Sequence, residues 1–383
     1  MTPKERLIQG LGGEATDRVP FFPKIWIDLA AALTGTDLCD VIEDPELALK
    51  IIVDAAVMVK ADGARQFLFP KRKVVRDGEQ VYEVDEKGKR LGSVDMAGGL
   101  ATQLDDDAYF RIDDPYFIAH SHQWKTSGPL IEGMSDVRRL AVPEKQFFEQ
   151  AGFGDLQRRM IAYAGDRVGL VGDLGSGTLP FHVAFRGMEN GLIDLFDKPE
   201  LVQAIFEKGA ACVIERGKFN IDCGHRVLRL NDSMANMELI SPDQWRAFIF
   251  PHFKAICDEL HGYQPDVKIY CHICGNVLPI VEMLVEAGLD AIAPLDPLGQ
   301  FTVADVRQRV GDDVVLMGGV NTLSFIQSTH DEIQTEAKTC IEQGVVRGNR
   351  GFVLGSGCVV PRATTKEMML AVAETTSHLA ETS

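Results

Sequence analysis

A histidine and two cysteines in this sequence have the spacing of metal ligands. His272 and Cys274 close the apolar run Lys268–Gly275, and Cys358 closes a second run, Gly351–Cys358, 84 positions after Cys274. Side chains of a strand alternate between its faces, so His272 and Cys274 point to the same side. A neighbouring strand would bring Cys358 beside them. One imidazole and two thiolates with an open fourth position are the ligand set of a catalytic zinc ion.

The same three residues have a simpler interpretation. Free cysteine is often a small buried hydrophobe, and a histidine at a strand end is often hydrogen-bonded within the structure. Both runs, however, read as equivalent strands, and glycines follow or precede the cysteines at Gly275, Gly355 and Gly357. This combination favours a zinc site over a packed core.

Composition limits the class of protein. The chain has 383 residues, a net charge of −17, 45% hydrophobic residues and eight cysteines. An acidic chain does not neutralise phosphates, so we expect no nucleic-acid partner and no binding to an anionic membrane. No apolar run reaches the roughly 20 residues of a membrane span, and the charged start lacks a signal peptide. We therefore expect a cytoplasmic protein with free or metal-bound thiols.

Alternating strands and helices dominate the chain. Each strand is apolar enough to be buried on both faces, which is typical of a parallel sheet. Eight such units predict a single-domain (β/α)8 barrel over residues 1–383, and a doubly wound open sheet is the alternative. The expected strands are Arg18–Lys24, Gly63–Phe69, Arg167–Asp173, His225–Asp232, Asp266–Gly275, Asp290–Asp296, Val314–Asn321 and Gly351–Cys358, with helices over 2–12, 44–60, 145–164, 181–194, 198–217, 241–262, 276–287, 302–310, 330–343 and 364–380.

Residues 71–135 interrupt this alternation after the second strand. Asp77-Gly78 and Lys87-Gly88 are hairpin turn signals, and a loop-rich stretch with many aromatic residues follows as far as Trp124. Long irregular segments in compact domains often carry function. We interpret 71–135 as an insertion near the active-site mouth, a partial lid over a pocket. The alternative is a surface insertion that packs on its own aromatic side chains.

A barrel places its chemistry at the C-terminal ends of its strands. Polar residues that the sequence places at these ends are Lys24, Asp173, Asp232, Asp296, Asn321 and the three proposed metal ligands. Finding the whole ligand set among the strand ends supports both the barrel and the metal site.

Several motifs resemble the uroporphyrinogen decarboxylase superfamily. They are DRVPFFPK, NDSMANMELISPDQW, HICGN and GFVLGSGCVVPRATTKEMM. The resemblance implies a (β/α)8 barrel. True decarboxylases of this superfamily carry an arginine-rich N-terminal motif, which the matching stretch VPFFPKIWIDLAAAL lacks. Its zinc-dependent, corrinoid-linked methyltransferases instead carry His-x-Cys and a distant Cys, which His272, Cys274 and Cys358 match.

This resemblance implies methyl transfer from a small donor to the cobalt of a corrinoid carried by a separate protein. Zinc would polarise the donor's heteroatom while cob(I)alamin takes the methyl group. Aromatic residues favour a methoxyaromatic donor. We predict catalytic roles for Asp232 and Asp173, which bind substrate or support the zinc. Predicted substrate-binding residues are Trp26, Phe22, Trp124 and Asn321.

Three other functions remain open. The first is a methylcobalamin:thiol methyltransferase, in which zinc lowers the pKa of a bound thiol. The second is a decarboxylase of the uroporphyrinogen type that works without a metal and protonates a carbanion from aspartates at the strand ends. The third is a zinc-stabilised scaffold or corrinoid-binding protein without catalysis.

Overall fold

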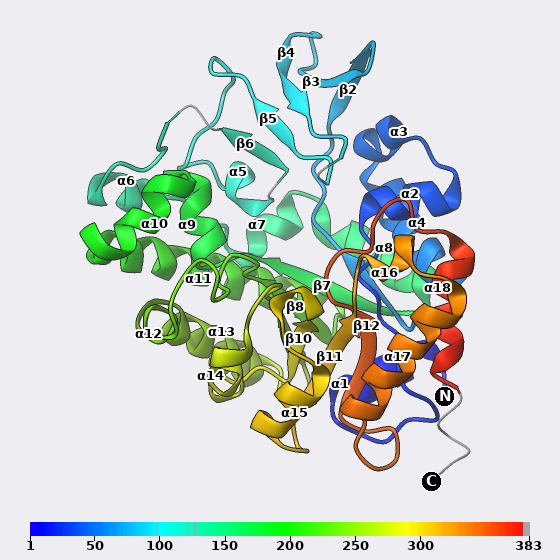
Figure 1. The fold of residues 1–383 in the computed structure, drawn as a ribbon. Helices are drawn as coiled ribbons and strands as arrows, with labels where there is room; N and C mark the ends of the chain where they lie inside the picture. Colours follow the sequence, from blue (N-terminus) through cyan, green and yellow to red (C-terminus); the bar gives the residue numbers. More distant parts are fainter. Residues whose placement is uncertain (98, 121, 126–127, 378–383) are drawn as a thin grey trace.

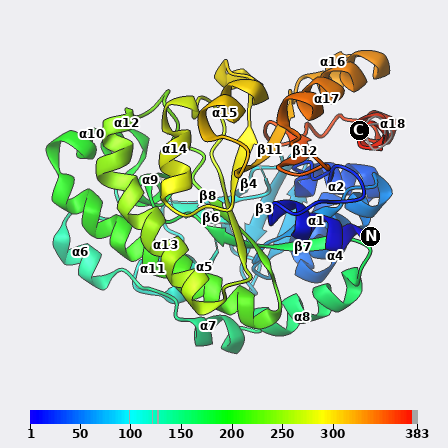
Figure 2. The same cartoon turned by 90° about the horizontal axis from the view of Figure 1, so that it is seen from below.

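Seven buried runs of the chain form one parallel sheet in the computed structural model, which describes residues 1–97, 99–120, 122–125 and 128–377 (Figure 1). The strands alternate with helices along the chain, and the sheet curls so that its two edges approach each other (Figure 2). In spatial order they are β1 (Gly63–Gln66), β7 (Gly169–Gly175), β8 (Val227–Asn231), β9 (Lys268–His272), β10 (Ala291–Leu295), β11 (Val315–Val320) and β12 (Phe352–Ser356).

Alternate residues of these strands face two different cores. Val315 and Met317 of β11 point into the interior of the curled sheet, where they join Tyr270 of β9. Leu316, between them, packs instead in the larger core between sheet and helices. This period of two is what a strand buried on both faces requires. The α/β class predicted from the sequence is therefore confirmed.

The sheet has seven strands rather than the predicted eight, because Arg18–Lys24 forms only isolated bridges. Phe22 N–H donates to Leu354 O of β12 at 2.8 Å, and Asp62 N–H, directly before β1, donates to Phe21 O at 2.7 Å. The segment thus bonds to both edges of the sheet. Its two prolines, Pro20 and Pro23, lack the N–H that a continuous ladder needs.

Helices cover the outside of the sheet. Capping residues mark their starts: Asp44 accepts the N–H groups of Glu46 and Leu47 at the beginning of α4, where Pro45 occupies the first turn. The helix predicted over 145–164 is divided into two. The helices are α1 (Pro3–Leu11), α2 (Ile27–Thr34), α3 (Leu38–Glu43), α4 (Pro45–Met58), α5 (Pro115–Ala119), α6 (Met134–Arg139), α7 (Lys145–Gln150), α8 (Phe153–Ala164), α9 (Leu179–Arg186), α10 (Met188–Asp197), α11 (Pro199–Cys223), α12 (Pro242–Gln244), α13 (Phe250–Tyr263), α14 (Val281–Glu286), α15 (Val303–Val310), α16 (Ser324–Gln327), α17 (His330–Gly344) and α18 (Lys366–Thr375).

A π-helical segment and two short 3-10 helices complete the covering layer. The π-helical segment η1 (Trp245–Ile249) precedes Pro251, whose missing N–H removes one backbone hydrogen bond of an α-helix. The 3-10 helices are η2 (Leu278–Ile280) and η3 (Pro297–Gly299). Among the described residues, none of the helices combines the length and the apolar character needed to cross a bilayer.

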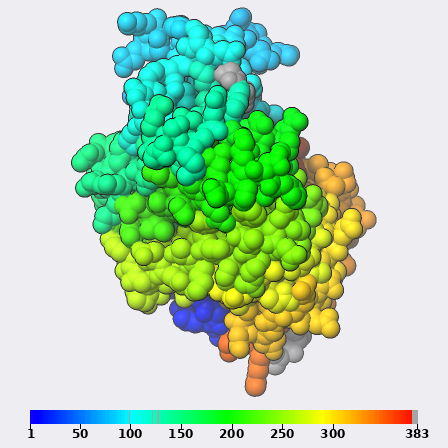
Figure 3. Space-filling view, turned by 90° about the vertical axis from the view of Figure 1, so that its left-hand side faces the viewer, coloured from blue at the N-terminus to red at the C-terminus, as the bar shows by residue number. Residues whose placement is uncertain are grey.

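Residues 71–135 contain a second, five-stranded sheet that stands above the parallel sheet (Figures 1 and 3). Asp77 pairs with Gln80 across a tight turn in which Gly78 has a φ of 60°, a value that glycine adopts at little cost. The last two strands pair in parallel. In order, the strands are β2 (Lys73–Asp77), β3 (Gln80–Val84), β4 (Arg90–Val94), β5 (Thr102–Leu104) and β6 (Gln123–Lys125).

Candidate metal centre and cavity

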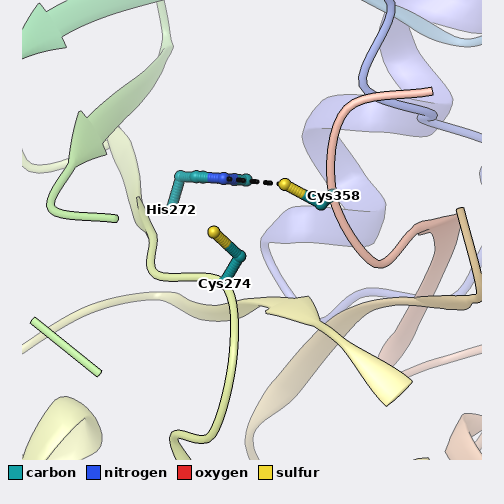
Figure 4. A group of neighbouring side chains, drawn as sticks. All are labelled: His272, Cys274 and Cys358. Atoms are coloured by element: carbon teal, nitrogen blue, oxygen red, sulfur yellow. Dashed lines mark hydrogen bonds between the residues drawn. The ribbon is translucent and has the colours of Figure 1, made fainter. Parts of the chain in front are cut away.

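His272, Cys274 and Cys358 converge at the C-terminal ends of β9 and β12 (Figure 4). His272 is the last residue of β9, Cys274 follows two positions later, and Cys358 lies two residues beyond the end of β12. Their ligand atoms all lie within 4.8 Å of one another, and Cys358 Sγ is 3.8 Å from His272 Nε2. Cys271 packs on the helix side of the strand, as its alternation with His272 requires.

The donor set fits a zinc ion. Tetrahedral zinc with ordinary Zn–N and Zn–S bonds places a nitrogen and a sulfur ligand about 3.6 Å apart, close to the 3.8 Å observed. Burial is the main cause that holds the pKa of His272 well below its ordinary value, and the nearby Lys24 and Arg229 act in the same direction. The imidazole is therefore neutral and offers a lone pair. A hydrogen bond from Cys274, aided by Lys24, lowers the pKa of the Cys358 thiol to about 6.

The hydrogen bond between Cys274 and Cys358, together with burial, raises the pKa of Cys274. A bound metal would displace the proton that the two sulfurs share. The three residues thus could hold a thiophilic divalent cation.

Lys24 approaches this centre from the extended segment 20–24. Its Nζ lies 2.8 Å from His272 Nε2, and its side chain is buried. Burial and the positive charge of Arg229 hold the pKa of Lys24 well below its ordinary value. The lysine therefore lies at the ring nitrogen that a metal ion would occupy, and it belongs to the candidate site.

A cavity of about 700 Å³ opens beside the three ligands. The insertion packs against the cavity wall at Gly99, which lies so close to Trp26 that a Cβ atom at this position would stand 2.7 Å from Trp26 Nε1. The walls come from the strand ends and from the insertion. The aromatic lining residues are Trp26, Phe67, Phe110, Phe117, Trp124, Phe148, Phe181 and Phe185.

Two arginines flank Asp173 on one wall of the cavity. Arg229 Nη1 donates to Asp173 Oδ1 at 2.7 Å, and Arg216 Nη2 donates to Asp173 Oδ2 at 2.8 Å. All three side chains are buried. A carboxylate held by two charge-assisted hydrogen bonds is a fixed anion rather than a mobile proton carrier.

Comparison with known proteins places this architecture in a family. The model of the uroporphyrinogen decarboxylase (URO-D) family matches residues 125–379, which include all three candidate ligands. The chain belongs to the URO-D family. Residues 1–124, with Lys24 and most of the insertion, lie outside the matched region.

Curated relatives of this URO-D family chain include both methyltransferases and decarboxylases. A methylated-thiol–coenzyme M methyltransferase of Methanosarcina mazei is 25% identical over 51% of this chain and 50% of its own length. A uroporphyrinogen decarboxylase of Picosynechococcus is 25% identical over 42% of this chain and 43% of its own. A methylcobamide:CoM methyltransferase MtaA of Methanosarcina barkeri is 23% identical over 46% and 48%. The chain spans about half the length of the curated relatives it matches.

A solved structure covers nearly the whole chain. A methyltransferase from Methanosarcina mazei superposes with a TM-score of 0.68 over 98% of this chain and 98% of its own, at 17% identity. At that identity the likeness establishes the fold alone. The fold that the two proteins share also includes most of the first 124 residues, which the family model does not match.

The structure separates the other predicted site residues into two groups. Asp173, Trp26 and Trp124 line the cavity. Phe22 is buried in the interior core of the curled sheet and does not appear on the wall, and Asn321 uses its side chain to accept the N–H of Leu323.

Asp232 lies behind the cavity wall. Its carboxyl accepts a hydrogen bond from Thr178, burial raises its pKa well above the ordinary value, and its N–H donates to His272 O at 3.0 Å. Asp232 therefore supports the strand end that carries His272 and is not among the cavity-lining residues.

Lys24, which the sequence places at the end of the first expected strand, lines the cavity. Polar lining residues that the sequence prediction of the site did not include are His120, His122, Arg216 and Arg229. Arg229 lies near the end of an expected strand, so the rule that found Asp173 also indicates it. Arg216 lies within the long helix α11 and the histidines lie in the insertion, where no periodic pattern marks them.

Proposed function

We propose that this chain transfers a methyl group between a small molecule and the cobalt of a corrinoid bound to a separate protein, with a zinc ion held by His272, Cys274 and Cys358. The observation that carries the proposal is the convergence of these ligands beside the 700 Å³ cavity. Zinc bound there would act as a Lewis acid toward a heteroatom of the substrate. The printed names of the Methanosarcina relatives support methyl transfer, and methylcobamide appears in one of them.

The residues around the triad have three tasks in this proposal. Aromatic side chains, with Trp26 and Trp124 among them, exclude water and hold an apolar methyl donor. Asp173 fixes Arg216 and Arg229 in place. Asp232 holds the His272 strand end through its backbone N–H.

A methoxyaromatic compound is the methyl donor that this lining favours. Eight aromatic residues border a cavity that is large enough to admit a substituted aromatic ring. The ether oxygen would face the metal ligands, and the C–O bond to the methyl group would break as the carbon–cobalt bond forms. Lys24, the nearest cation to the triad, is placed to stabilise the leaving oxygen.

Methyl transfer to a thiol is the second candidate, and the names of the relatives favour it. A zinc ion with two thiolate ligands and one imidazole lowers the pKa of a bound thiol. The methyl group would then leave the corrinoid and form a bond with sulfur. Both directions need the same triad and differ in the molecule that the cavity holds.

One set of assays tests these functions. Purified, zinc-saturated protein is mixed with free cob(I)alamin and a panel of methoxyaromatic compounds, and the loss of cob(I)alamin is followed by its absorbance. A second arm mixes methylcobalamin with thiols, and a third measures carbon dioxide release from uroporphyrinogen. Methyl transfer in either of the first two arms, lost on zinc removal, supports the proposal. Metal-independent decarboxylation without methyl transfer would overturn it.

A further inference from the structure

The cavity is positively charged although the chain as a whole is not. The net charge of the chain is −17. The cavity wall nevertheless carries Lys125, Arg216 and Arg229 against Asp28 and Asp173, besides Lys24, whose pKa is lowered by burial. A neutral metal centre of one Zn²⁺ and two thiolates would leave this excess in place.

Asp173 cannot neutralise the two arginines that hold it. Its carboxylate already accepts from Arg229, from Arg216 and from the N–H of Gly175 at 3.1 Å. Both guanidinium groups are more than nine-tenths buried, and the Nε–H of each has no acceptor in the part of the chain that the structure describes. A buried cation with an unused donor is costly unless a ligand supplies the missing acceptor.

His120 adds a further donor from the insertion. Its Nδ1 accepts the N–H of His122 at 3.3 Å, so the proton of the neutral ring resides on Nε2. Burial lowers the pKa of His120 to about 3, which keeps the ring neutral. Among the described residues the Nε2–H group has no partner, and the side chain is 4% exposed.

These donors form a continuous wall. Arg229 and Arg216 meet at Asp173, and Arg216 Nη1 donates to the carbonyl of Ala119, the residue before His120, at 3.4 Å. Arg229 and His272 line the same cavity. The wall therefore extends from the metal ligands to the insertion and offers donors without matching acceptors.

We propose that the substrate carries a carboxylate or a similar singly charged oxygen anion, which accepts hydrogen bonds from Arg216, Arg229 and His120 while its methyl-exchanging atom faces the metal triad. The anion site does not depend on the proposed function, whereas the placement of the methyl-exchanging atom at the metal triad rests on it. The anion belongs either to the methoxyaromatic donor or to the thiol acceptor. The same hydrogen-bond donors would recognise the anion in either molecule, so the test has one arm for the methoxyaromatic donor and one for the thiol.

Binding, rather than turnover, is the measurement. Titration calorimetry on zinc-saturated protein without corrinoid compares 4-methoxybenzoate with 4-methoxybenzamide, and mercaptoacetate with mercaptoacetamide. We expect the anion of at least one pair to bind about tenfold more tightly or better, since charge-assisted hydrogen bonds are stronger than neutral ones. Equal affinity within both pairs would overturn the inference.

Matched variants assign the effect to the wall. His120→Asn keeps an acceptor for the N–H of His122 but removes the outer donor, whereas His120→Gln restores a donor near the Nε2 position. We expect the preference for the anion to fall in His120→Asn and in Arg216→Gln, and to recover in His120→Gln. Arg246→Gln removes an exposed arginine paired with Glu286 and should leave the preference unchanged.

The outcomes separate this inference from the proposed function. A retained anion preference in a protein that transfers no methyl group would disprove the function and keep the anion site. Methyl transfer with no preference between the charged and neutral partners would keep the function and disprove the anion site. Thermal melts of each variant show whether it is folded, and an unchanged preference in folded His120→Asn and Arg216→Gln counts against the wall.

Discussion

Nζ of Lys24 lies 2.8 Å from Nε2 of His272, the same ring nitrogen that faces Sγ of Cys358 at 3.8 Å. A bound metal would take the lone pair of that nitrogen. The lysine would then have to direct its donors elsewhere, toward the substrate. The contact thus couples the state of the metal site to the cavity.

Lys24→Met should therefore raise the affinity for zinc, by about tenfold if one hydrogen bond of about 1.5 kcal/mol no longer competes. Competition with a chromophoric chelator measures the change. Lys125→Met is the control, because Lys125 bonds to the Ala108 carbonyl. Weaker zinc binding in Lys24→Met would show that the lysine supports the metal site.

Cys274→Ala should lower the zinc content from about one ion per chain to a small fraction, because two protein ligands hold zinc far less tightly than three. Elemental analysis after dialysis measures it. Cys271→Ala is a matched control, since Cys271 faces the helix-side core one residue before His272. Full retention of zinc in Cys274→Ala would remove Cys274 from the ligand set.

Cys358→Ser should reduce methyl transfer by on the order of 100-fold or more while the fold remains, because a serine hydroxyl is a poor zinc ligand at neutral pH. Cys358 is only half-buried, so little packing is lost. Absorbance assays with cob(I)alamin and a thermal melt on one sample, with excess zinc, test both claims. A wild-type rate of methyl transfer in a folded Cys358→Ser variant would show that Cys358 is not a catalytic zinc ligand.

Trp124→Ala should raise KM or alter the preference among methyl donors without unfolding the protein. Trp124 lines the cavity from β6, and its side chain is 37% exposed. Tyr109→Ala is the control, because Tyr109 belongs to the same insertion but is not a lining residue. Identical kinetics of wild type and Trp124→Ala across several donors would mean that the insertion is structural.

Acid should destabilise the protein through its buried histidines. Burial lowers the pKa of His225 to about 4, against an ordinary value of 6.5. Between these values the unfolded state binds a proton that the folded state does not, so stability falls as the pH drops from 6.5 to 4. One such histidine accounts for a loss of about 3 kcal/mol.

His225→Gln isolates this contribution. Glutamine does not titrate and can preserve the hydrogen bond to Gln157, now 2.9 Å from the histidine ring. Urea unfolding at pH 7, 6 and 5 should show a shallower loss of stability in the variant than in wild type. Parallel curves for the two proteins would contradict the assignment.

The sequence predicted the parts of the site that obey local rules. Alternation along a strand is enough to place His272 and Cys274 on one face, and seven of the expected strands form the sheet. The eighth failed because prolines at positions 20 and 23 remove ladder donors, which the apolar character of that stretch conceals.

Residues that depend on distant contacts were not predictable in this way. Arg216, for example, reaches Asp173 across 43 positions. Nothing in the local pattern of α11 distinguishes an arginine that enters the cavity from one that faces solvent. Phe22 was assigned to the substrate because it is aromatic. In the structure its side chain points into the interior core of the curled sheet.

Segment 20–24 bonds to β12 across more than 300 positions of the chain. During synthesis, His272 and Cys274 leave the ribosome well before Cys358, so the nascent chain carries an incomplete set of thiols for some time. Contacts of such long sequence separation also form late in folding. If the three residues hold a metal ion, the site is complete only once β12 has been synthesised, and until then Cys274 is open to oxidation or to capture of another metal.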